Sequence, residues 1–180
     1  MTRSTPARER SSITDAGPAL TVCEAFQRAA AIAPEAVALR MPGDAQTITW
    51  RQYADQVHQI AAGLAGLGVG RGDTVSLMMA NRIEFYPLEV GAQHLGATSF
   101  SIYNTLSAEQ LTHIFTNAGT KVVLCEGQYV DRIRASGIDI EHIVCIDEPY
   151  EGALTLEDLI AAAPSDFDSN HPGVQCSPRT

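Results

Sequence analysis

The chain has 180 residues, of which 45% are apolar and 18% are charged, and its formal net charge is -9. This length fits one domain that buries roughly 70% of its unfolded surface, and the composition is that of a folded globular protein. The acidic balance argues against nucleic acid as a partner, because such a partner requires clustered lysine and arginine to release phosphate counterions. Nine carboxylates and one arginine lie between Asp139 and Thr180, and we interpret this stretch as a solvated surface.

No apolar run approaches the roughly 18 residues of a membrane span. Residues 1–18 mix arginine with serine, threonine and proline and lack the apolar core of a signal peptide. We therefore predict a cytoplasmic protein whose residues 1–18 form a flexible arm.

The first predicted element is a helix that Thr21 caps and Pro34 ends. Its expected inward face consists of Val22, Ala25, Phe26, Ala29 and Ala33. Two β-prone runs, residues 36–40 and 46–50, then flank the turn sequence Pro42-Gly43-Asp44. This order predicts a β-hairpin.

The strongest helical period of the chain follows Thr49. Its apolar positions are Tyr53, Val57, Ile60, Ala61, Leu64 and Leu67. Gly68 is the expected left-handed stop. The glycines around it also suggest a phosphate loop, but such a loop follows a strand and opens a helix. Because these glycines follow a helix and precede a strand, we favour a helix stop and a tight connecting loop.

Four short strands are predicted after Gly68, and their starts lie 20 to 24 residues apart. The runs are residues 74–79, 98–103, 121–125 and 141–146. Each interval has room for one crossover helix and two short loops. We therefore predict an α/β fold with a partial doubly wound parallel sheet and crossover helices, preceded by a helix and a β-hairpin.

The crossover helices carry start signals of their own. Two begin with a capping-box pattern, namely Asn81 with Glu84 and Ser107 with Gln110. A weaker helix is predicted over residues 129–136, and a last one begins after Thr155 and stops at Pro164. The predicted domain thus spans residues 19–164, and residues 165–180 form an aperiodic tail.

Ligands in open α/β sheets bind beyond the carboxyl ends of the strands. The polar or aromatic residues expected there are Asn81, Tyr103, Asn104, Glu126, Asp147 and Glu148. Helix capping and turn formation explain Asn81 and Asn104 equally well, and both interpretations stay open. The sequence contains no G-x-S-x-G, no G-x-x-x-x-G-K-[ST] and no zinc-type histidine spacing. Cys125 and Cys145 are expected to be small buried hydrophobes in strands.

A set of short motifs resembles the N-terminal part of the adenylate-forming acyl-CoA ligases. The matching residues are Thr49-Trp50-x-x-Tyr53, Ala62-Gly63-Leu64, Leu67-Gly68-Val69, Gly72-Asp73-x-Val75, Asn81-x-x-Glu84-Phe85, Gly91, Leu95-Gly96-Ala97 and Ile102-Tyr103-Asn104-Thr105. The run from Ser101 to Thr105 is similar to the long-chain fatty-acid branch, and a looser similarity extends from about Thr21 to Asp168.

This resemblance implies ATP-dependent activation of a fatty acid to an acyl adenylate and transfer of the acyl group to coenzyme A, with ATP, magnesium and coenzyme A as cofactors of the intact family. The family's phosphate loop and catalytic lysine have no counterpart in these 180 residues. We therefore assign no catalytic, cofactor-binding or metal residue and expect the chain to be inactive alone. Three alternatives stay open: half of a split ligase completed by a second chain, a noncatalytic acyl-binding or interaction module, and a ligase portion for an amino or aryl acid.

Overall fold

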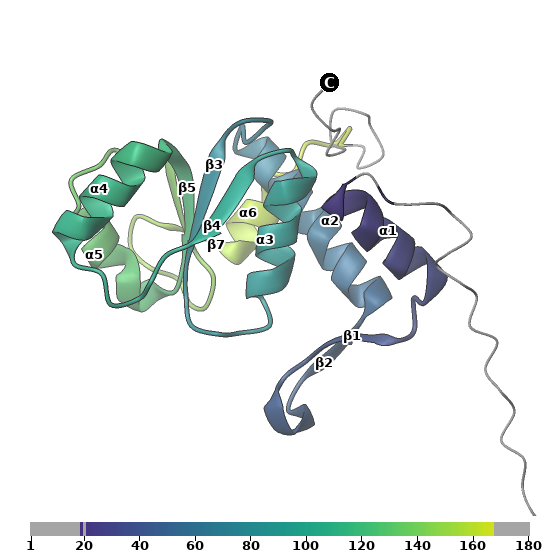
Figure 1. Cartoon of the computed structure of the whole chain (residues 1–180). Helices are drawn as coiled ribbons and strands as arrows, with labels where there is room; N and C mark the ends of the chain where they lie inside the picture. Colours follow the sequence, from purple (N-terminus) through teal and green to yellow (C-terminus); the bar gives the residue numbers. More distant parts are fainter. Residues whose placement is uncertain (1–18, 20, 168–180) are drawn as a thin grey trace, which may run out of the picture.

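The computed structural model describes residue 19 and residues 21–167 (Figure 1). The predicted arm at residues 1–18 and residues 168–180 of the predicted tail lie outside these described residues. Within them, the segment after the last helix returns to the body of the fold, because the Phe167 ring packs 5.6 Å from the ring of His58.

Five parallel strands form the central sheet, which confirms the predicted fold class. Their spatial order is β4-β3-β5-β6-β7. The bounds are β3 (Thr74–Met78), β4 (Thr98–Ser101), β5 (Thr120–Cys125), β6 (His142–Cys145) and β7 (Leu154–Thr155). The prediction missed β7, because a strand of two residues is too short to produce an apolar run.

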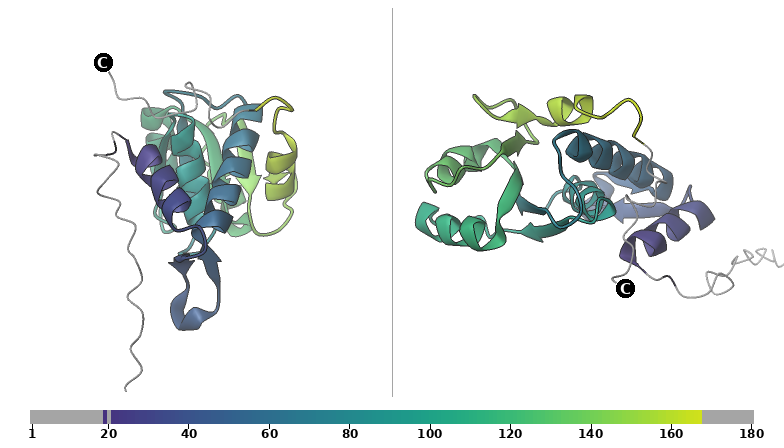
Figure 2. Two further views of the ribbon diagram at one scale, coloured as in Figure 1. Left: turned by 90° about the vertical axis from the view of Figure 1, so that its right-hand side faces the viewer. Right: turned by 90° about the horizontal axis from the view of Figure 1, so that it is seen from above.

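Helices cover both faces of this sheet (Figures 1 and 2). One face carries α2 (Trp50–Gly66), α3 (Phe85–His94) and α6 (Leu156–Ala161), and the other carries α4 (Ala108–Ala118) and α5 (Val130–Arg134). Side chains of β5 alternate between the two layers, with Val122 and Leu124 facing α2 and Val123 and Cys125 facing α4. Both layers are apolar, which explains why the strands lack a polar face.

The two crossover connections next to β3 lie on opposite faces of the sheet. The chain leaves β3 over α3 to reach β4, and then crosses over α4 on the opposite face to reach β5. Because β3 lies between β4 and β5, its carboxyl end and that of β5 border the topological switch point of the sheet. Open α/β sheets bind their ligands at such a point.

The N-terminal helix and hairpin form as predicted, as α1 (Val22–Ile32), β1 (Val37–Arg40) and β2 (Thr47–Thr49). The inward face expected for α1 is correct at Phe26, which packs against the cluster of Ile48, Tyr53 and Val57, but wrong at Val22 and Ala25, which are exposed. Val22 is 72% exposed, whereas Cys23 is buried. The reason is the Phe26 ring, which meets the ring of Tyr53 edge-on at 4.8 Å and turns the Cys23 side of the helix inward.

Three helix starts have the capping box, and one predicted start does not. Thr49 with Gln52, Ser107 with Gln110, and Thr155 with Asp158 each make both bonds of the box. The box predicted for Asn81 and Glu84 is wrong, because α3 begins only at Phe85 and has no side-chain cap. Gly68 does end α2, with a φ of +77°.

The predicted burial of the two strand cysteines is confirmed. Cys125 and Cys145 are register partners on β5 and β6, and both are buried. Burial raises the pKa of the Cys125 thiol to about 12. A thiol with so high a pKa remains protonated at neutral pH and packs as a small hydrophobe.

A buried histidine should make the stability of the fold depend on pH. His94 ends α3, is 5% exposed and donates its Nδ1–H to the Val90 carbonyl at 2.8 Å. Burial lowers the pKa of His94, although the hydrogen bond opposes this shift. The unfolded chain therefore takes up a proton at higher pH than the folded chain does. Stability should fall as the pH drops from about 7 to 5.5, through the ordinary histidine pKa toward the lowered one.

His94→Gln is expected to reduce this slope, measured as urea midpoints across that pH range. The control is His113→Gln, because His113 is exposed on α4. This variant should keep the slope of the parent chain. A parent stability that does not change over the range would contradict the prediction.

Candidate functional site

A cleft of about 670 Å³ opens at the carboxyl ends of β3 and β4, beside the start of α3. Its lining consists of Met79, Ala80, Asn81, Arg82, Phe85, Tyr86, Ser101, Ile102, Tyr103, Asn104 and Thr105. Three of the six residues predicted at strand ends, Asn81, Tyr103 and Asn104, thus come together in one cleft.

The wall that follows β4 is held by Ile102 and by Arg132, whose Nη1 donates to the carbonyls of Asn104 and Leu106. Ile102 is 4% exposed and donates its backbone N–H to the Leu77 carbonyl at 2.8 Å, which continues the pairing of the two strands. The next residue, Tyr103, is 81% exposed. The chain thus turns outward directly after a buried anchor, and Tyr103 and Asn104 face the solvent side of the cleft.

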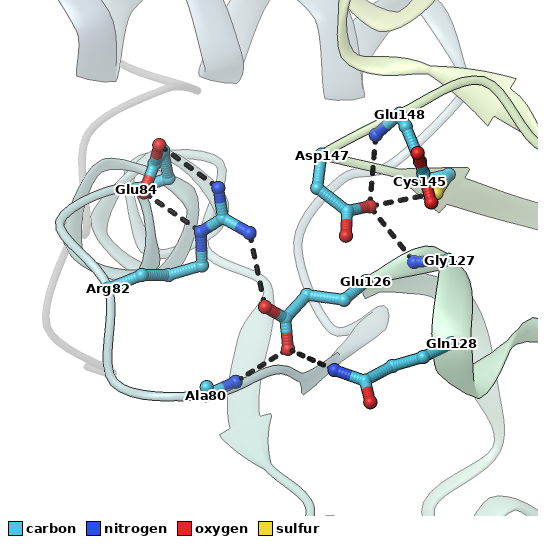
Figure 3. A network of polar contacts seen from close by, with 9 residues as sticks. All are labelled: Ala80, Arg82, Glu84, Glu126, Gly127, Gln128, Cys145, Asp147 and Glu148. Atoms are coloured by element: carbon cyan, nitrogen blue, oxygen red, sulfur yellow. Dashed lines mark hydrogen bonds and ion pairs between the residues drawn. The ribbon is translucent and has the colours of Figure 1, made fainter.

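The opposite wall is the β3–α3 loop, residues 79–84, and polar contacts fix it to the end of β5 (Figure 3). Glu126 accepts hydrogen bonds from the Ala80 N–H at 2.9 Å and from Arg82 Nη1 at 3.2 Å. Arg82 also donates from Nε and Nη2 to the two oxygens of Glu84, at 2.9 and 3.2 Å. The Gln128 amide lies 3.5 Å from Glu126.

These contacts shift the titration of the groups involved. The hydrogen bond from Arg82 lowers the pKa of Glu84, although partial burial opposes the shift. The same bond to Glu84, helped by the charge of Glu126, raises the pKa of Arg82. Both shifts favour the ionised forms of Arg82 and Glu84 at neutral pH.

Sequence reasoning missed Arg82. The local signal was a charged residue placed directly after the end of a strand and beside Asn81. Its partner Glu126 lies 44 positions further along the chain, and nothing in the sequence marks the two as neighbours.

The other three predicted residues, Glu126, Asp147 and Glu148, do not line the cleft. Asp147 and Glu148 lie in the loop after β6. The Asp147 carboxylate accepts hydrogen bonds from the Gly127 N–H at 2.9 Å, the Glu148 N–H at 3.0 Å and the Cys145 thiol at 3.2 Å. Partial burial raises the pKa of Asp147, but these hydrogen bonds together lower it below its usual value. Asp147 thus joins the loops that follow β5 and β6, although both it and Glu148 are exposed.

The cleft offers apolar contact and neutral hydrogen-bonding groups. Within the described part of the chain, no hydrogen bond engages the side chains of Asn81, Ser101 and Thr105, so a ligand could use them. Arg82, the cation of the lining, is already paired with two carboxylates. The lining therefore favours apolar or neutral polar groups over a highly charged anion.

The cofactors that the ligase family uses do not fit the described residues on their own. The triphosphate of ATP needs several donors and an available cation, whereas the cation of this cleft is neutralised. Magnesium prefers clustered carboxylates, and residues 19 and 21–167 contain no group of three or more acidic, histidine or cysteine side chains that could hold a metal. No helix among these residues is both long and apolar enough to cross a membrane.

Comparisons with known proteins agree with the fold. The profile of the family described as AMP-binding enzyme matches residues 26–178. The uncharacterized protein Rv1549 of Mycobacterium tuberculosis (strain ATCC 25618 / H37Rv) is 71% identical over 142 residues, which cover 79% of this chain and 81% of that protein. The long-chain-fatty-acid–CoA ligase FadD13 of the same strain is 29% identical over 159 residues, which cover 84% of this chain.

Among solved structures, the anthranilate CoA ligase AuaEII in complex with anthranoyl-AMP superposes with a TM-score of 0.72 at 26% identity. That match covers 81% of this chain and 29% of the ligase. The match to FadD13 likewise covers 29% of FadD13. The chain therefore spans less than a third of the length of each of these two ligases.

Proposed function

Because the chain belongs to the AMP-binding enzyme family, we propose that it is the N-terminal portion of a fatty-acid–CoA ligase. In this proposal the cleft forms one wall of a site that further ligase segments complete. The observation that carries the proposal is the family match over residues 26–178 on a fold whose cleft lies at the carboxyl ends of the strands. The similarity to the fatty-acid ligase FadD13 supports the choice of substrate class.

The intact reaction has two steps. A fatty-acid carboxylate attacks the α-phosphorus of ATP, which releases pyrophosphate and forms an acyl adenylate, and the thiol of coenzyme A then displaces AMP. Catalysis of the first step depends on donors around the phosphates. We infer that residues 21–167 alone do not provide these donors, because Arg82 is paired with Glu84 and Glu126.

Pyrophosphate release from ATP in the presence of a long-chain fatty acid tests the proposal. The purified 180-residue chain should release no more pyrophosphate than a blank without fatty acid. Addition of a polypeptide that carries the complementary portion of a FadD13-type ligase should give release that depends on both polypeptides. Fatty-acid-dependent release by the 180 residues alone would overturn the inference that they are inactive by themselves.

A noncatalytic acyl-binding module is the second candidate. The apolar side chains of Met79, Phe85 and Ile102 in the lining favour it. Calorimetric titration of the chain with a fatty acid, without ATP, discriminates between the two candidates. Saturable binding with no turnover in the complemented assay would support the module. Parallel titration with an aryl acid tests the alternative that the chain is a ligase portion for an amino or aryl acid.

A further inference from the structure

Glu126 stands directly after β5, is 8% exposed and is absent from the lining of the cleft. Its carboxylate nevertheless faces the β3–α3 loop, where one oxygen accepts the Ala80 N–H and the other accepts Arg82 Nη1 (Figure 3). Its own backbone N–H donates to the Met78 carbonyl at 3.3 Å. Glu126 therefore forms hydrogen bonds with both the last residue of β3 and the loop that follows it.

Arg82 extends this attachment to the start of α3. It binds Glu126 on one side and both oxygens of Glu84 on the other. Glu84 is the residue before α3, and no side chain caps this helix. The Arg82–Glu84 pair therefore lies at the start of α3, where a capping side chain is usually found. Glu126 in turn holds Arg82.

The setting distinguishes these contacts from an ordinary surface ion pair. The side chain of Glu126 is mostly buried and that of Arg82 is 25% exposed, whereas exposed pairs contribute little because solvent screens them. A mostly buried carboxylate that keeps charged and backbone donors is costly to leave unpaired. Movement of the loop away from β5 would break these contacts, so their cost favours the observed position of the loop.

We propose that Glu126 is a positioning residue for the cleft. It acts through Ala80 and Arg82 and holds the 79–84 wall in the place where Asn81 contributes to the lining. The identity of the ligand rests on the proposed function, but the positioning role does not, because the position of the loop can be measured without a ligand.

Amide hydrogen exchange, read residue by residue by NMR, tests the positioning role in the full chain. Glu126→Ala should speed exchange at Ala80 by about tenfold or more, because a charge-assisted bond is lost. The amides of Val123 and Leu124, in the middle of β5, should keep their protection. Glu126→Gln keeps a neutral acceptor for Ala80 but loses the charge that holds Arg82, so it should give a smaller increase at Ala80.

The matched control is Glu109→Gln, because Glu109 is exposed on α4. It should leave exchange at Ala80 unchanged. Unchanged exchange at Ala80 in both Glu126 variants, or an equal rise throughout β5, would overturn the proposal. If Glu126→Ala does not fold, Glu126→Gln decides on the same criterion.

A kinetic measurement uses the 180-residue chain together with the polypeptide that carries the complementary portion of a FadD13-type ligase. The three substrates are ATP, the fatty acid and coenzyme A. Glu126→Gln should raise the KM of at least one of the three substrates several-fold while kcat changes less than twofold, because a displaced wall weakens binding before it alters chemistry. If the loop loosens but all three KM values stay unchanged, the role in the cleft is refuted. If the parent proteins show no activity at all, the proposed function fails, and the exchange experiment still decides the positioning role.

Discussion

Gly66→Ala is expected to destabilise the fold by about 3 kcal/mol or more, because two helices meet there with their backbones in contact. A Cβ atom at Gly66 would lie 1.8 Å from the carbonyl oxygen and 2.5 Å from the carbonyl carbon of Ala162. These are main-chain atoms at the end of α6, so no side-chain rotation relieves the clash. The helix α6 would have to shift away from α2 and give up the packing of Leu159, which is fully buried.

Urea denaturation measures this effect, and Gly70 provides the control. A Cβ atom at Gly70 meets nothing within 4 Å, and its φ lies outside the left-handed region. Gly70→Ala should therefore leave stability unchanged or raise it by less than about 1 kcal/mol, because alanine restricts the unfolded chain. Similar midpoints for Gly66→Ala and Gly70→Ala would contradict the close packing of α2 and α6.

Gly63 contacts the same helix, since a Cβ atom there would lie 2.3 Å from the Leu159 carbonyl oxygen. Once α6 has moved to accommodate one new methyl group, it also has more room for the other. The double variant with alanine at Gly63 and Gly66 should therefore cost less than the sum of the two single changes. Strictly additive losses of stability would contradict this expectation. They would mean that separate structural shifts relieve the clashes at Gly63 and Gly66.

Local signals predicted most of the regular structure. The strands stood out because each apolar run is bounded by turn residues, and Ser107 with Gln110 predicted the start of α4 because the capping box involves only neighbours in sequence. The pattern of Asn81 and Glu84 looked the same and failed. Its glutamate is engaged by Arg82, and a short sequence pattern cannot reveal such a competitor.

The cleft could be predicted only in part for a similar reason. The rule that ligands bind beyond strand ends selected Asn81, Tyr103 and Asn104, which do line the cleft. It could not separate these from Asp147, because the order of strands in the sheet decides which ends are neighbours. The pairing of Arg82 with Glu126 depends on the parallel register of β3 and β5, in which Met78 is opposite Cys125.

Phe115→Ala is expected to cost about 3–5 kcal/mol, the range for removal of a buried aromatic side chain. Phe115 is 1% exposed and lies on the inward side of α4, in the cluster that includes Leu111, Val123 and Ile133. Among the described α-helices, only α4 and the five-residue α5 cover this face. Few side chains are therefore available to move into the space left by the ring, and the cavity should persist.

The matched variant is Tyr103→Ala, which removes an aromatic ring that is 81% exposed at the rim of the cleft. Its midpoint in urea should stay within about 0.5 kcal/mol of the parent, as is usual for surface positions. Because Tyr103 contributes to the lining but not to the core, this variant should alter ligand binding without unfolding the chain. A large loss of stability in Tyr103→Ala, or a small loss in Phe115→Ala, would contradict this prediction. Either result would mean that the burial of the two rings does not separate the core from the wall of the cleft.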